Sequence, residues 1–342
     1  MYNKTLEVRR DAYANGIKCG LYDTQALLPI WKTDRPSLKL VHSQVLQQVQ
    51  VRVDLAFQAF FQRVKKGADE PGYPRFKSVG RYDSITYPQY ENGARLHDRT
   101  LVLSKIGSVK VILHRPIEGQ IKTVTVRRAA TGKWFVSFSV ETEGCRLPPS
   151  DAAVGVDVGL ASFATLSNGE KIANPRFLRR DEADLKRVQR RKDAAKKAQD
   201  WEENTLQKVL LGKIHARIAN RRSDFAHKQS RDLVNRFGVI AFEDLNITGR
   251  LKNHCLAKSI ADAAWNQLVQ YTTSKAGEAG RRVVLVDPCN TSKRCSRCGQ
   301  LVKKDLSVRV HTCPVCGLVL DRDENAAINI LALGLQRVGE NP

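Results

Sequence analysis

Two C-x-x-C pairs near the C-terminal end place the strongest constraint on how this chain folds. Cys295 and Cys298 form the first pair, Cys313 and Cys316 form the second, and a glycine follows each pair. This spacing is typical of a zinc ribbon, in which two tight turns each direct two thiolates at one tetrahedral ion. Since four thiolates leave no open position for a substrate, we predict one structural Zn²⁺ in a ribbon over residues 289–319.

The main alternative for these cysteines is a pair of disulfides, which form in oxidising compartments. The sequence starts without an apolar signal peptide that would indicate such a compartment, which favours zinc. The remaining cysteines occur singly, and we expect them to be small buried apolar side chains. These are Cys19, Cys145, Cys255 and Cys289.

Positive charge is the dominant feature of the composition. The chain has 57 Lys and Arg against 35 Asp and Glu, a net charge of +22. Such an excess favours a nucleic acid, because each neutralised phosphate releases condensed counterions. An anionic membrane surface fits less well, since the basic residues are spread over most of the chain rather than gathered on one amphipathic helix. No apolar run approaches the roughly 18 to 20 residues that span a bilayer, so we expect a cytoplasmic protein without a membrane partner.

Residues 1–72 are predicted to form a helical region. From about residue 43 to 66, apolar side chains recur every three or four positions, which indicates a helix with one buried face. Ser43 is the expected N-cap, and Gly67 is expected to follow the last turn. We interpret the apolar stripe as core, and it comprises Val45, Val49, Val53, Ala56, Phe57, Phe60 and Phe61.

Residues 73–149 change to the two-residue period of strands and predict a small antiparallel β domain with a hairpin that bends at "AATGK". The opening stretch "YPRFKSVGRYDSITYPQY" interleaves aromatic and basic residues, which can stack on bases and clamp phosphates. The alternative is an ordinary strand edge with solvated charges. The nucleic-acid-binding candidates here are Arg75, Lys77, Arg81 and Tyr82.

Residues 150–342 follow a stiff "LPPS" linker and complete a predicted α+β multidomain chain. The expected order is a meander of three strands, a helix, a strand, a helix, a strand, the ribbon and a last helix. This order predicts a ribonuclease-H-like fold, in which helices flank a mixed sheet. The basic helical stretch over 176–236 is either a solvated surface or a rail along a nucleic-acid backbone. The net charge favours the rail, with Arg190 and Arg191 as candidates.

One aspartate lies inside the first apolar strand of this domain. In "AAVGVDVGL", alternation sends the three valines to one face and Asp157, between Gly155 and Gly159, to the other. A charge in an apolar strand costs free energy unless it is paired or bound to metal. We expect the glycines to leave room for ions and a phosphate backbone. The alternative role is an aspartate that holds a turn at the strand end.

A second acid, Glu243, ends another apolar strand and is followed by Asp244. Carboxylates from two strand ends and a third element can hold two Mg²⁺ ions about 4 Å apart for phosphodiester hydrolysis. Either acid alone would instead cap the following turn, but the pair favours Glu243 as a metal ligand.

The third acid lies in "DRDENAAINIL", just after the ribbon. Asp321 and Glu324 have the spacing of a capping box, so Asp321 is predicted to be the N-cap of the last helix. Asp323 falls in the first turn and is expected to face the two strand acids, because the positions on its side of the helix are apolar. Those positions are Ala327, Ile330 and Leu331. An exposed carboxylate that compensates the helix dipole is the alternative.

Taken in order, "GVDVGL", "AFEDLN", "LAKSIADAAW", "CSRCG…CPVCG" and "DRDENAAINIL" resemble the motifs of the TnpB family. This family comprises insertion-sequence-encoded RNA-guided DNA nucleases related to type V CRISPR effectors. "YPRFKSVGRYDSITYPQ" resembles its N-terminal half, so the resemblance covers nearly the whole chain. It implies a RuvC-like nuclease domain with Asp157, Glu243 and Asp323 as catalytic acids and the four paired cysteines as zinc ligands.

The resemblance also implies partners. These are a guide RNA from the transposon end and a target DNA with a short adjacent duplex motif read by the N-terminal lobe. Backbone contacts to a guide–target heteroduplex would explain the basic charge. Members of the family usually begin with a strand, whereas this chain opens inside the first helix, so we expect its wedge-like β domain to lack one strand.

Three rival functions remain open. An RNA-guided DNA-binding regulator would have lost its nuclease acids, but all three positions here are acidic. A transposase would join DNA ends with the same carboxylates and would differ by forming strand-transfer products without RNA. A structural zinc protein of a ribonucleoprotein leaves Asp157 between two glycines unexplained.

Overall fold

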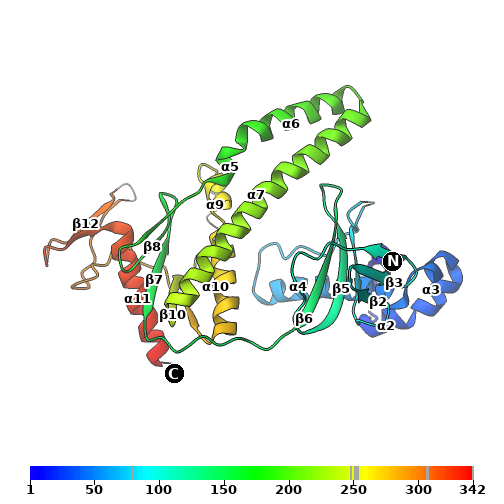
Figure 1. Ribbon diagram of the computed structural model, residues 1–342, viewed down its shortest axis with the longest axis horizontal. Helices are drawn as coiled ribbons and strands as arrows, with labels where there is room; N and C mark the ends of the chain where they lie inside the picture. Colours follow the sequence, from blue (N-terminus) through cyan, green and yellow to red (C-terminus); the bar gives the residue numbers. More distant parts are fainter. Residues whose placement is uncertain (79, 247–248, 250–253, 306–307, 341–342) are drawn as a thin grey trace. The chain divides into compact units, whose positions relative to one another are not determined.

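The chain folds into two compact units, Met1–Glu143 and Gly144–Pro342 (Figure 1). The helices and antiparallel strands expected in the N-terminal part lie in the first unit, and the ribonuclease-H-like elements and the cysteine pairs lie in the second. The computed structural model describes residues 1–78, 80–246, 249, 254–305 and 308–340.

The first unit begins with helices that pack on the long helix α4. Their bounds are α1 Tyr2–Ala14, α2 Leu21–Ala26, α3 Leu28–Asp34, the 3₁₀ helix η1 Pro36–Leu40, and α4 Ser43–Lys65. The predicted stripe is buried at Val45, Val49, Val53 and Phe57, but Phe61 at the end of α4 is 51% exposed. Since Ser43 is the first helical residue, the N-cap is His42 and the prediction of Ser43 as N-cap is wrong. Gly67 follows the helix with a φ of +66°, as expected.

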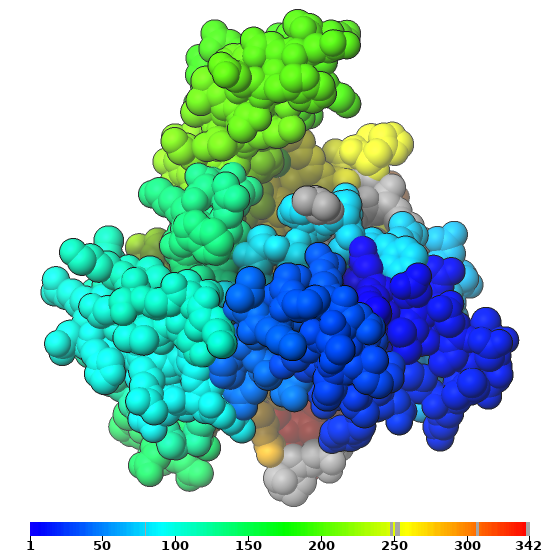
Figure 2. Space-filling view, turned by 90° about the vertical axis from the view of Figure 1, so that its right-hand side faces the viewer, coloured from blue at the N-terminus to red at the C-terminus, as the bar shows by residue number. Residues whose placement is uncertain are grey.

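Two three-stranded antiparallel sheets complete the first unit. One has the order β1-β5-β6, and the other is the meander β2-β3-β4. The bounds are β1 Ser84–Tyr87, β2 Ala94–His97, β3 Thr100–Leu103, β4 Gly107–Lys110, β5 Gln120–Arg128 and β6 Trp134–Glu141. The β5–β6 hairpin bends at 129–133 as predicted. Val45 of α4 packs with Tyr87 and Leu101 from the two sheets, which joins the helices to the strands of this unit. Figure 2 shows the helices of this unit in blue beside its strands in cyan and green.

The second unit is built on a five-stranded mixed sheet with the order β11-β10-β7-β8-β9. Strands β7, β8 and β9 form the antiparallel meander, whereas β10 runs parallel to both β7 and β11. This arrangement confirms the predicted ribonuclease-H-like sheet. The bounds are β7 Ala153–Val158, β8 Ser162–Leu166, β9 Lys171–Ala173, β10 Val239–Glu243 and β11 Arg282–Val286.

Helices cover both faces of this sheet (Figure 1), and the larger of the hydrophobic clusters among the described residues lies on one of them. Val154 and Val156 of β7 are fully buried there against Leu233 of α7 and Leu268 of α10. On the other face, α11 packs on β7, β8, β10 and β11. The bounds are α5 Phe177–Arg180, α6 Glu182–Lys197, α7 Trp201–Arg236, α9 Ala257–Ala263, α10 Trp265–Ala279 and α11 Arg322–Glu340. The ribbon between β11 and α11 contains β12 Val310–Thr312 and β13 Val319–Asp321.

Gly155 has a packing role, so the expectation that it leaves room for ions and phosphate is wrong. A Cβ at this position would lie 2.0 Å from the carbonyl oxygen of Ala327 and 2.6 Å from the amide nitrogen of Leu331. The backbone of α11 therefore fills the space above Gly155. This close approach fixes the start of α11 relative to β7, where Asp157 lies.

We predict that Gly155→Ala destabilises the protein by about 3 kcal/mol or more, because rigid backbone atoms cannot move aside for the new methyl group. Gly277→Ala is the matched control, since Gly277 lies in helix α10 with no atom within 4 Å of its would-be Cβ. There the same change should stabilise by about 1 kcal/mol, the usual helix preference for alanine. Urea unfolding of both variants measures the difference, and equal midpoints would contradict the packing role.

Candidate active site

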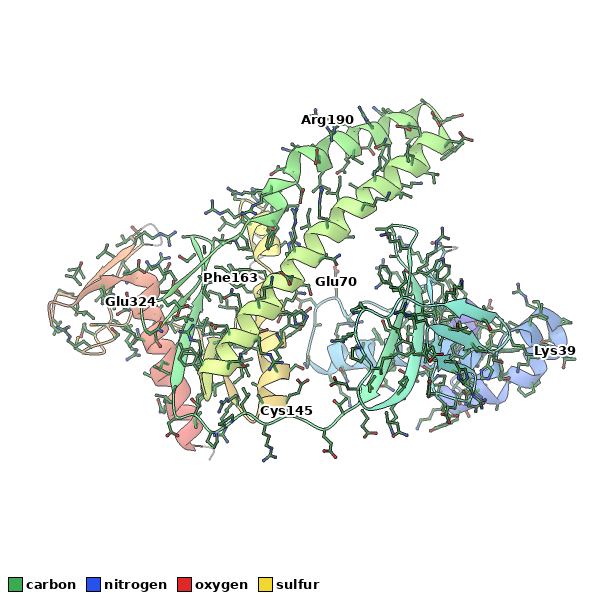
Figure 3. The ribbon with its side chains drawn as sticks, viewed as in Figure 1. Lys39, Glu70, Cys145, Phe163, Arg190 and Glu324 are labelled. Carbon is green, nitrogen blue, oxygen red and sulfur yellow. The ribbon has the colours of Figure 1, made fainter. Side chains whose placement is uncertain are left out.

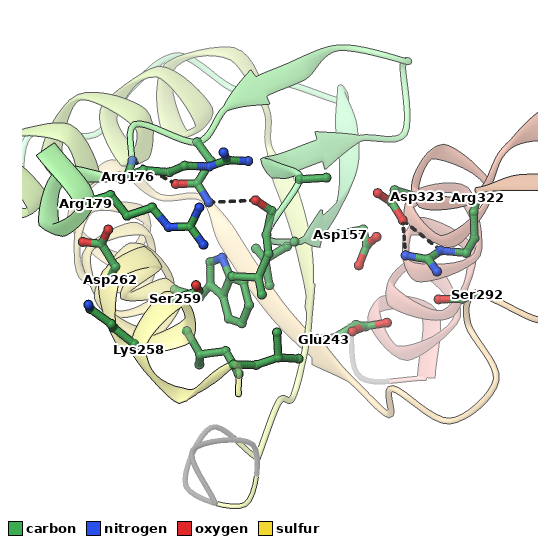
Figure 4. A pocket seen from close by; sticks show the side chains of 18 of the residues that line it. Asp157, Arg176, Arg179, Glu243, Lys258, Ser259, Asp262, Ser292, Arg322 and Asp323 are labelled. Carbon is green, nitrogen blue, oxygen red and sulfur yellow. Dashed lines mark hydrogen bonds and ion pairs between the residues drawn. The ribbon is translucent and has the colours of Figure 1, made fainter. Parts of the chain in front are cut away.

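The three predicted acids come from three elements and line one cavity of about 680 Å³ in the second unit (Figure 4). Asp157 lies near the end of β7, Glu243 is the last residue of β10, and Asp323 lies in the first turn of α11. Because β7 and β10 are parallel neighbours, their carboxyl ends meet at one edge of the sheet. The predicted convergence of Asp157, Glu243 and Asp323 on one place is therefore present.

Glu243 is held by the segment that leads into the ribbon. Its Oε1 accepts a hydrogen bond of 2.5 Å from the hydroxyl of Thr291. Thr291 is 3% exposed, so this contact is shielded from water. The hydrogen bond orients the carboxylate and ties the edge of the sheet to the ribbon.

Asp321 caps helix α11, as predicted. Its Oδ1 accepts from the amide of Asp323 at 2.8 Å and from that of Glu324 at 3.3 Å, and its Oδ2 pairs with Lys171 Nζ at 2.6 Å. Although burial opposes it, the hydrogen bonds from Lys171 and from these two amides lower the pKa of Asp321. Asp321 therefore stabilises the helix start.

Asp323, by contrast, turns to the cavity and is bracketed by two arginines. Its Oδ1 contacts Arg322 Nη2 at 3.0 Å and Nε at 3.1 Å, and its Oδ2 lies 3.6 Å from Arg309 Nη1 (Figure 4). The carboxylate is charge-compensated by the chain itself. The exposed dipole-compensating alternative does not fit, since the side chain is only 17% exposed.

The opposite wall of the cavity is basic, which the sequence reasoning missed. Arg176, Arg179 and Lys258 line it (Figure 4). Arg176 directly precedes α5 with a φ of +50°. The local signals were "NPRFLRR" and the lysine of "LAKSIADAAW", but neither stretch shows by itself that it lies opposite the acids. The cavity therefore has cations on one side, and on the other side carboxylates together with Arg309 and Arg322.

A buried acid behind the basic wall has a structural role. Asp262 of α9 is 7% exposed and accepts hydrogen bonds from the amide of Leu178 at 3.0 Å and from Arg222 at 2.6 Å. These bonds join α5, α7 and α9. Its carboxylate is therefore already satisfied by the chain.

The four paired cysteines form a cluster that fits zinc. Their Sγ atoms all lie within 4.8 Å of one another, and Cys295–Cys316 and Cys298–Cys313 are each 3.6 Å apart. Sulfurs about 2.3 Å from a tetrahedral zinc would be about 3.8 Å apart, so the spacing matches. Hydrogen bonds from the backbone amides of Cys316 and Val315 lower the pKa of the Cys313 thiol to about 6, which favours the thiolate that binds metal.

Among the described residues, this is the only group of three or more Cys, His, Asp or Glu whose ligand atoms lie that close together. The three carboxylates at the cavity therefore form a wider arrangement. They still offer the hard oxygen donors that Mg²⁺ prefers.

Two asparagines of α11 dock the ribbon on the last helix. Asn325 donates to the carbonyl of Arg294 at 2.8 Å and accepts from the amide of Ser296 at 3.0 Å. Asn329 donates to the carbonyls of Thr291 and Arg294, each at 2.8 Å. Asn325 is fully buried and Asn329 is 7% exposed. We call Asn325 and Asn329 the latch, because they hold the first cysteine turn on α11. This turn is close in sequence to Thr291, which donates to Glu243.

Some of the predicted nucleic-acid-binding residues contact other side chains of the protein, and the others are exposed. Lys77 lies 5.2 Å from the Tyr82 ring, and Arg52 lies at the same distance from it. Lys77 and Tyr82 thus stabilise the first unit itself. Arg75 and Arg81 are exposed, as are Arg190 and Arg191 on α6. Figure 3 shows Arg190 on this helix.

The single cysteines are less buried than expected. Cys19 is half-buried, and Cys145, Cys255 and Cys289 are exposed. The prediction that they are core residues is wrong, because each falls in a loop or a turn outside the apolar faces. None of the described helices has an apolar stretch long enough to cross a bilayer.

The sheet order, the acids at its edge and the ribbon before the last helix define a ribonuclease-H-like domain with an inserted four-cysteine module. Two family models match this chain: "Cas12f1-like, TNB domain" over residues 265–330 and "Probable transposase" of the OrfB_IS605 type over residues 136–254. A "Putative RNA-guided DNA endonuclease" of Streptomyces pristinaespiralis is 39% identical, over 98% of this chain and 83% of that protein. The "Putative RNA-guided DNA endonuclease InsQ" of Escherichia coli K12 is 31% identical, over 98% and 86%.

The chain therefore belongs to the TnpB family, as the motifs predicted. Among solved structures, a Cas12f1–sgRNA–target DNA complex is similar in fold, with a TM-score of 0.56. The match covers 96% of this chain and 79% of that one at 16% identity, and it supports the fold.

Proposed function

We propose that this protein is an RNA-guided DNA endonuclease of a transposable element that cleaves target DNA by phosphodiester hydrolysis. The observation that carries the proposal is the cavity in which Asp157, Glu243 and Asp323 face a basic wall. The names of its relatives support a guide RNA and a target DNA as partners.

Asp157, Glu243 and Asp323 would hold two Mg²⁺ ions, and Cys295, Cys298, Cys313 and Cys316 would hold one structural Zn²⁺. Bound Mg²⁺ would activate the attacking water and stabilise the leaving oxygen. The chain's own groups prepare the site: Thr291 orients Glu243, and the packing of α11 on Gly155 sets the position of Asp323.

The basic wall would bind the substrate strand. Arg176 and Arg179 can neutralise backbone phosphates near the scissile bond, whereas Lys258 already pairs with Glu182. Arg309 and Arg322 compensate Asp323 and lie at the acidic side of the same cavity. Metal ions that bind the carboxylate would compete with these two guanidinium groups.

We further propose a division of labour along the chain. Residues 1–72 and 73–149 would form the recognition region and the wedge-like domain that bind guide and target, and residues 150–342 the nuclease. Arg75 and Arg81 of the first unit, with Arg190 and Arg191 of α6, would contact the nucleic-acid backbone. The sequence itself would be read by base pairing between guide and target. Lys77 and Tyr82 would act by shaping the surface that carries Arg75 and Arg81.

The proposal is tested by sequencing RNA that co-purifies with the protein and then reprogramming it against a plasmid. We expect linearised plasmid only with matching guide RNA and Mg²⁺, and none with EDTA. Binding of guide and target without any cut would instead indicate a DNA-binding regulator. Strand-transfer products formed without RNA would indicate a transposase, and either result would overturn the proposal.

A further inference from the structure

Helices α6 and α7 form a long antiparallel hairpin (Figure 1). A groove of about 440 Å³ lies between them, and its lining residues are separate from those of the acidic cavity. The polar residues that line it are Asp184, Arg187, Arg191, Gln207, Lys213 and Arg217, among aliphatic side chains. Four cations thus face one acid. A groove of this composition favours an anionic ligand.

Two of these cations are available to an anion. Arg187 and Arg217 are occupied, since Asp184 lies 2.8 Å from Arg187 and Arg217 lies 2.8 Å from Asp181. Within the part of the chain that the structure describes, no acid lies within 4.0 Å of Arg191 or Lys213. One of these two residues comes from each helix, so a phosphate chain laid along the groove can reach both.

A buried amide in the groove adds a second requirement. Gln207 is 3% exposed, and its Nε2 donates to Glu203 Oε1 at 2.8 Å. A carboxylate only accepts, so this bond fixes which end of the amide is which. No described donor lies within hydrogen-bond distance of the other end, Oε1. An unpaired buried acceptor costs about 1–3 kcal/mol, so a ligand that brings a donor gains that free energy.

The chemistry of the groove selects one class of ligand. Gln207 Oε1 is shielded from solvent in the empty groove, so a ligand must displace lining side chains to reach it. The ligand must then present a hydroxyl donor next to its phosphates. Ribose carries such a 2′-hydroxyl and deoxyribose does not.

We propose that the α6–α7 groove binds the sugar–phosphate backbone of RNA, with Arg191 and Lys213 on phosphates and Gln207 Oε1 accepting from a ribose 2′-hydroxyl. This inference rests on the RNA partner of the proposed function but not on DNA cleavage. It assigns the hairpin the task of distinguishing RNA from DNA.

The test compares binding of single-stranded RNA, DNA and 2′-O-methyl RNA of one sequence to nucleic-acid-free protein. Gln207→Leu is expected to weaken RNA binding about five- to tenfold, as for one lost hydrogen bond, with DNA binding unchanged. The 2′-O-methyl RNA lacks the hydroxyl donor, so it should bind the wild-type protein more weakly than unmodified RNA does. The Gln207→Leu variant should bind the two RNAs equally well. Gln189→Leu on the exposed side of α6 is the control and should change nothing.

The phosphate contact is tested separately. Lys213→Ala should weaken RNA binding and reduce the slope of log affinity against log salt by about 0.7. Lys208 is an exposed lysine of α7 outside the groove, and Lys208→Ala should have a much smaller effect.

Equal losses for RNA and DNA in Gln207→Leu, or no loss in either, would overturn the 2′-hydroxyl contact. Equal effects of Lys213→Ala and Lys208→Ala would overturn the groove. Because the assay measures binding alone, an inactive nuclease that still prefers RNA would leave this inference standing and refute only the proposed cleavage.

Discussion

Asp323→Asn is expected to lower cleavage of a programmed target at least about a hundredfold, whereas Asp321→Asn retains most of it. The two residues stand two positions apart, but only Asp323 lines the cavity that Asp157 and Glu243 share. Asparagine keeps the shape of the side chain and removes the charge that attracts a metal ion. At Asp321 it remains a good N-cap for the amides of Asp323 and Glu324.

The stability of both variants is expected to fall only slightly. The pKa of Asp321 is lowered in the folded protein, so its contribution to stability is present above the unfolded pKa and is lost as the pH falls through the folded value. At neutral pH, Asp321→Asn therefore loses the ion pair with Lys171, which costs at most about 1 kcal/mol for partly exposed groups. Asp323→Asn removes the charge that pairs with Arg322 and Arg309 but keeps an oxygen that can accept from Arg322, so its unfolding midpoint should also fall only slightly.

Cleavage assays at matched guide occupancy, with Asp157→Ala as the reference for a lost strand acid, measure the ranking. Guide and target binding should be unchanged in all three variants, because a carboxylate contributes little contact area. A larger loss in Asp321→Asn than in Asp323→Asn would reverse the roles of the two aspartates. Similar moderate losses in both, with lowered unfolding midpoints, would indicate that the helix start matters and the Asp323 charge does not.

Motif spacing was sufficient to predict the sheet, the acids and the cysteine cluster, because each depends on local periodicity. Alternation in β7 placed Asp157 opposite the buried valines, and the capping pattern separated Asp321 from Asp323. The basic wall could not be predicted, since Arg176 and Lys258 are about 80 residues apart and meet only through the packing of α5 and α9. Predicting it requires the tertiary fold.

The role of Gly155 shows a different limit. A glycine beside an acid was interpreted as space for a ligand, but the structure fills that space with the backbone of α11. Sequence alone gives the absence of a side chain and not what occupies the gap. The same holds for Asn325 and Asn329: their positions in the sequence indicate only two polar side chains four residues apart, whereas in the structure they dock the ribbon.

Replacing both Cys313 and Cys316 with serine is expected to remove the bound zinc and lower cleavage at least about a hundredfold. Structural zinc contributes about 10–16 kcal/mol to the folding of small zinc modules, and serine hydroxyls do not replace thiolates. The main core of the second unit lies between the sheet and α7 and α10, away from the ribbon. We therefore expect local unfolding of the ribbon with a retained sheet.

The link from the ribbon to the acids runs through the latch. Asn329 holds the carbonyl of Thr291, and the hydroxyl of Thr291 holds Glu243. Asp321 ends β13 of the ribbon and directly precedes α11, so the ribbon also determines the position of Asp323 in the first helical turn. Loss of the zinc would loosen two of the three acids at once.

Elemental analysis and cleavage assays of matched variants separate these steps. Cys145→Ser with Cys289→Ser makes the same chemical change at two exposed single cysteines and should retain both zinc and activity. Asn325→Leu should retain zinc but lose activity, because it leaves the partly buried amide of Ser296 without its acceptor and the carbonyl of Arg294 with Asn329 alone, while all four thiolates remain. Wild-type protein without zinc would contradict the metal site itself. Full cleavage by Asn325→Leu would show instead that the acids keep their positions without the docked ribbon. The cysteine module and the three acids would then be neighbours in sequence but not coupled in function.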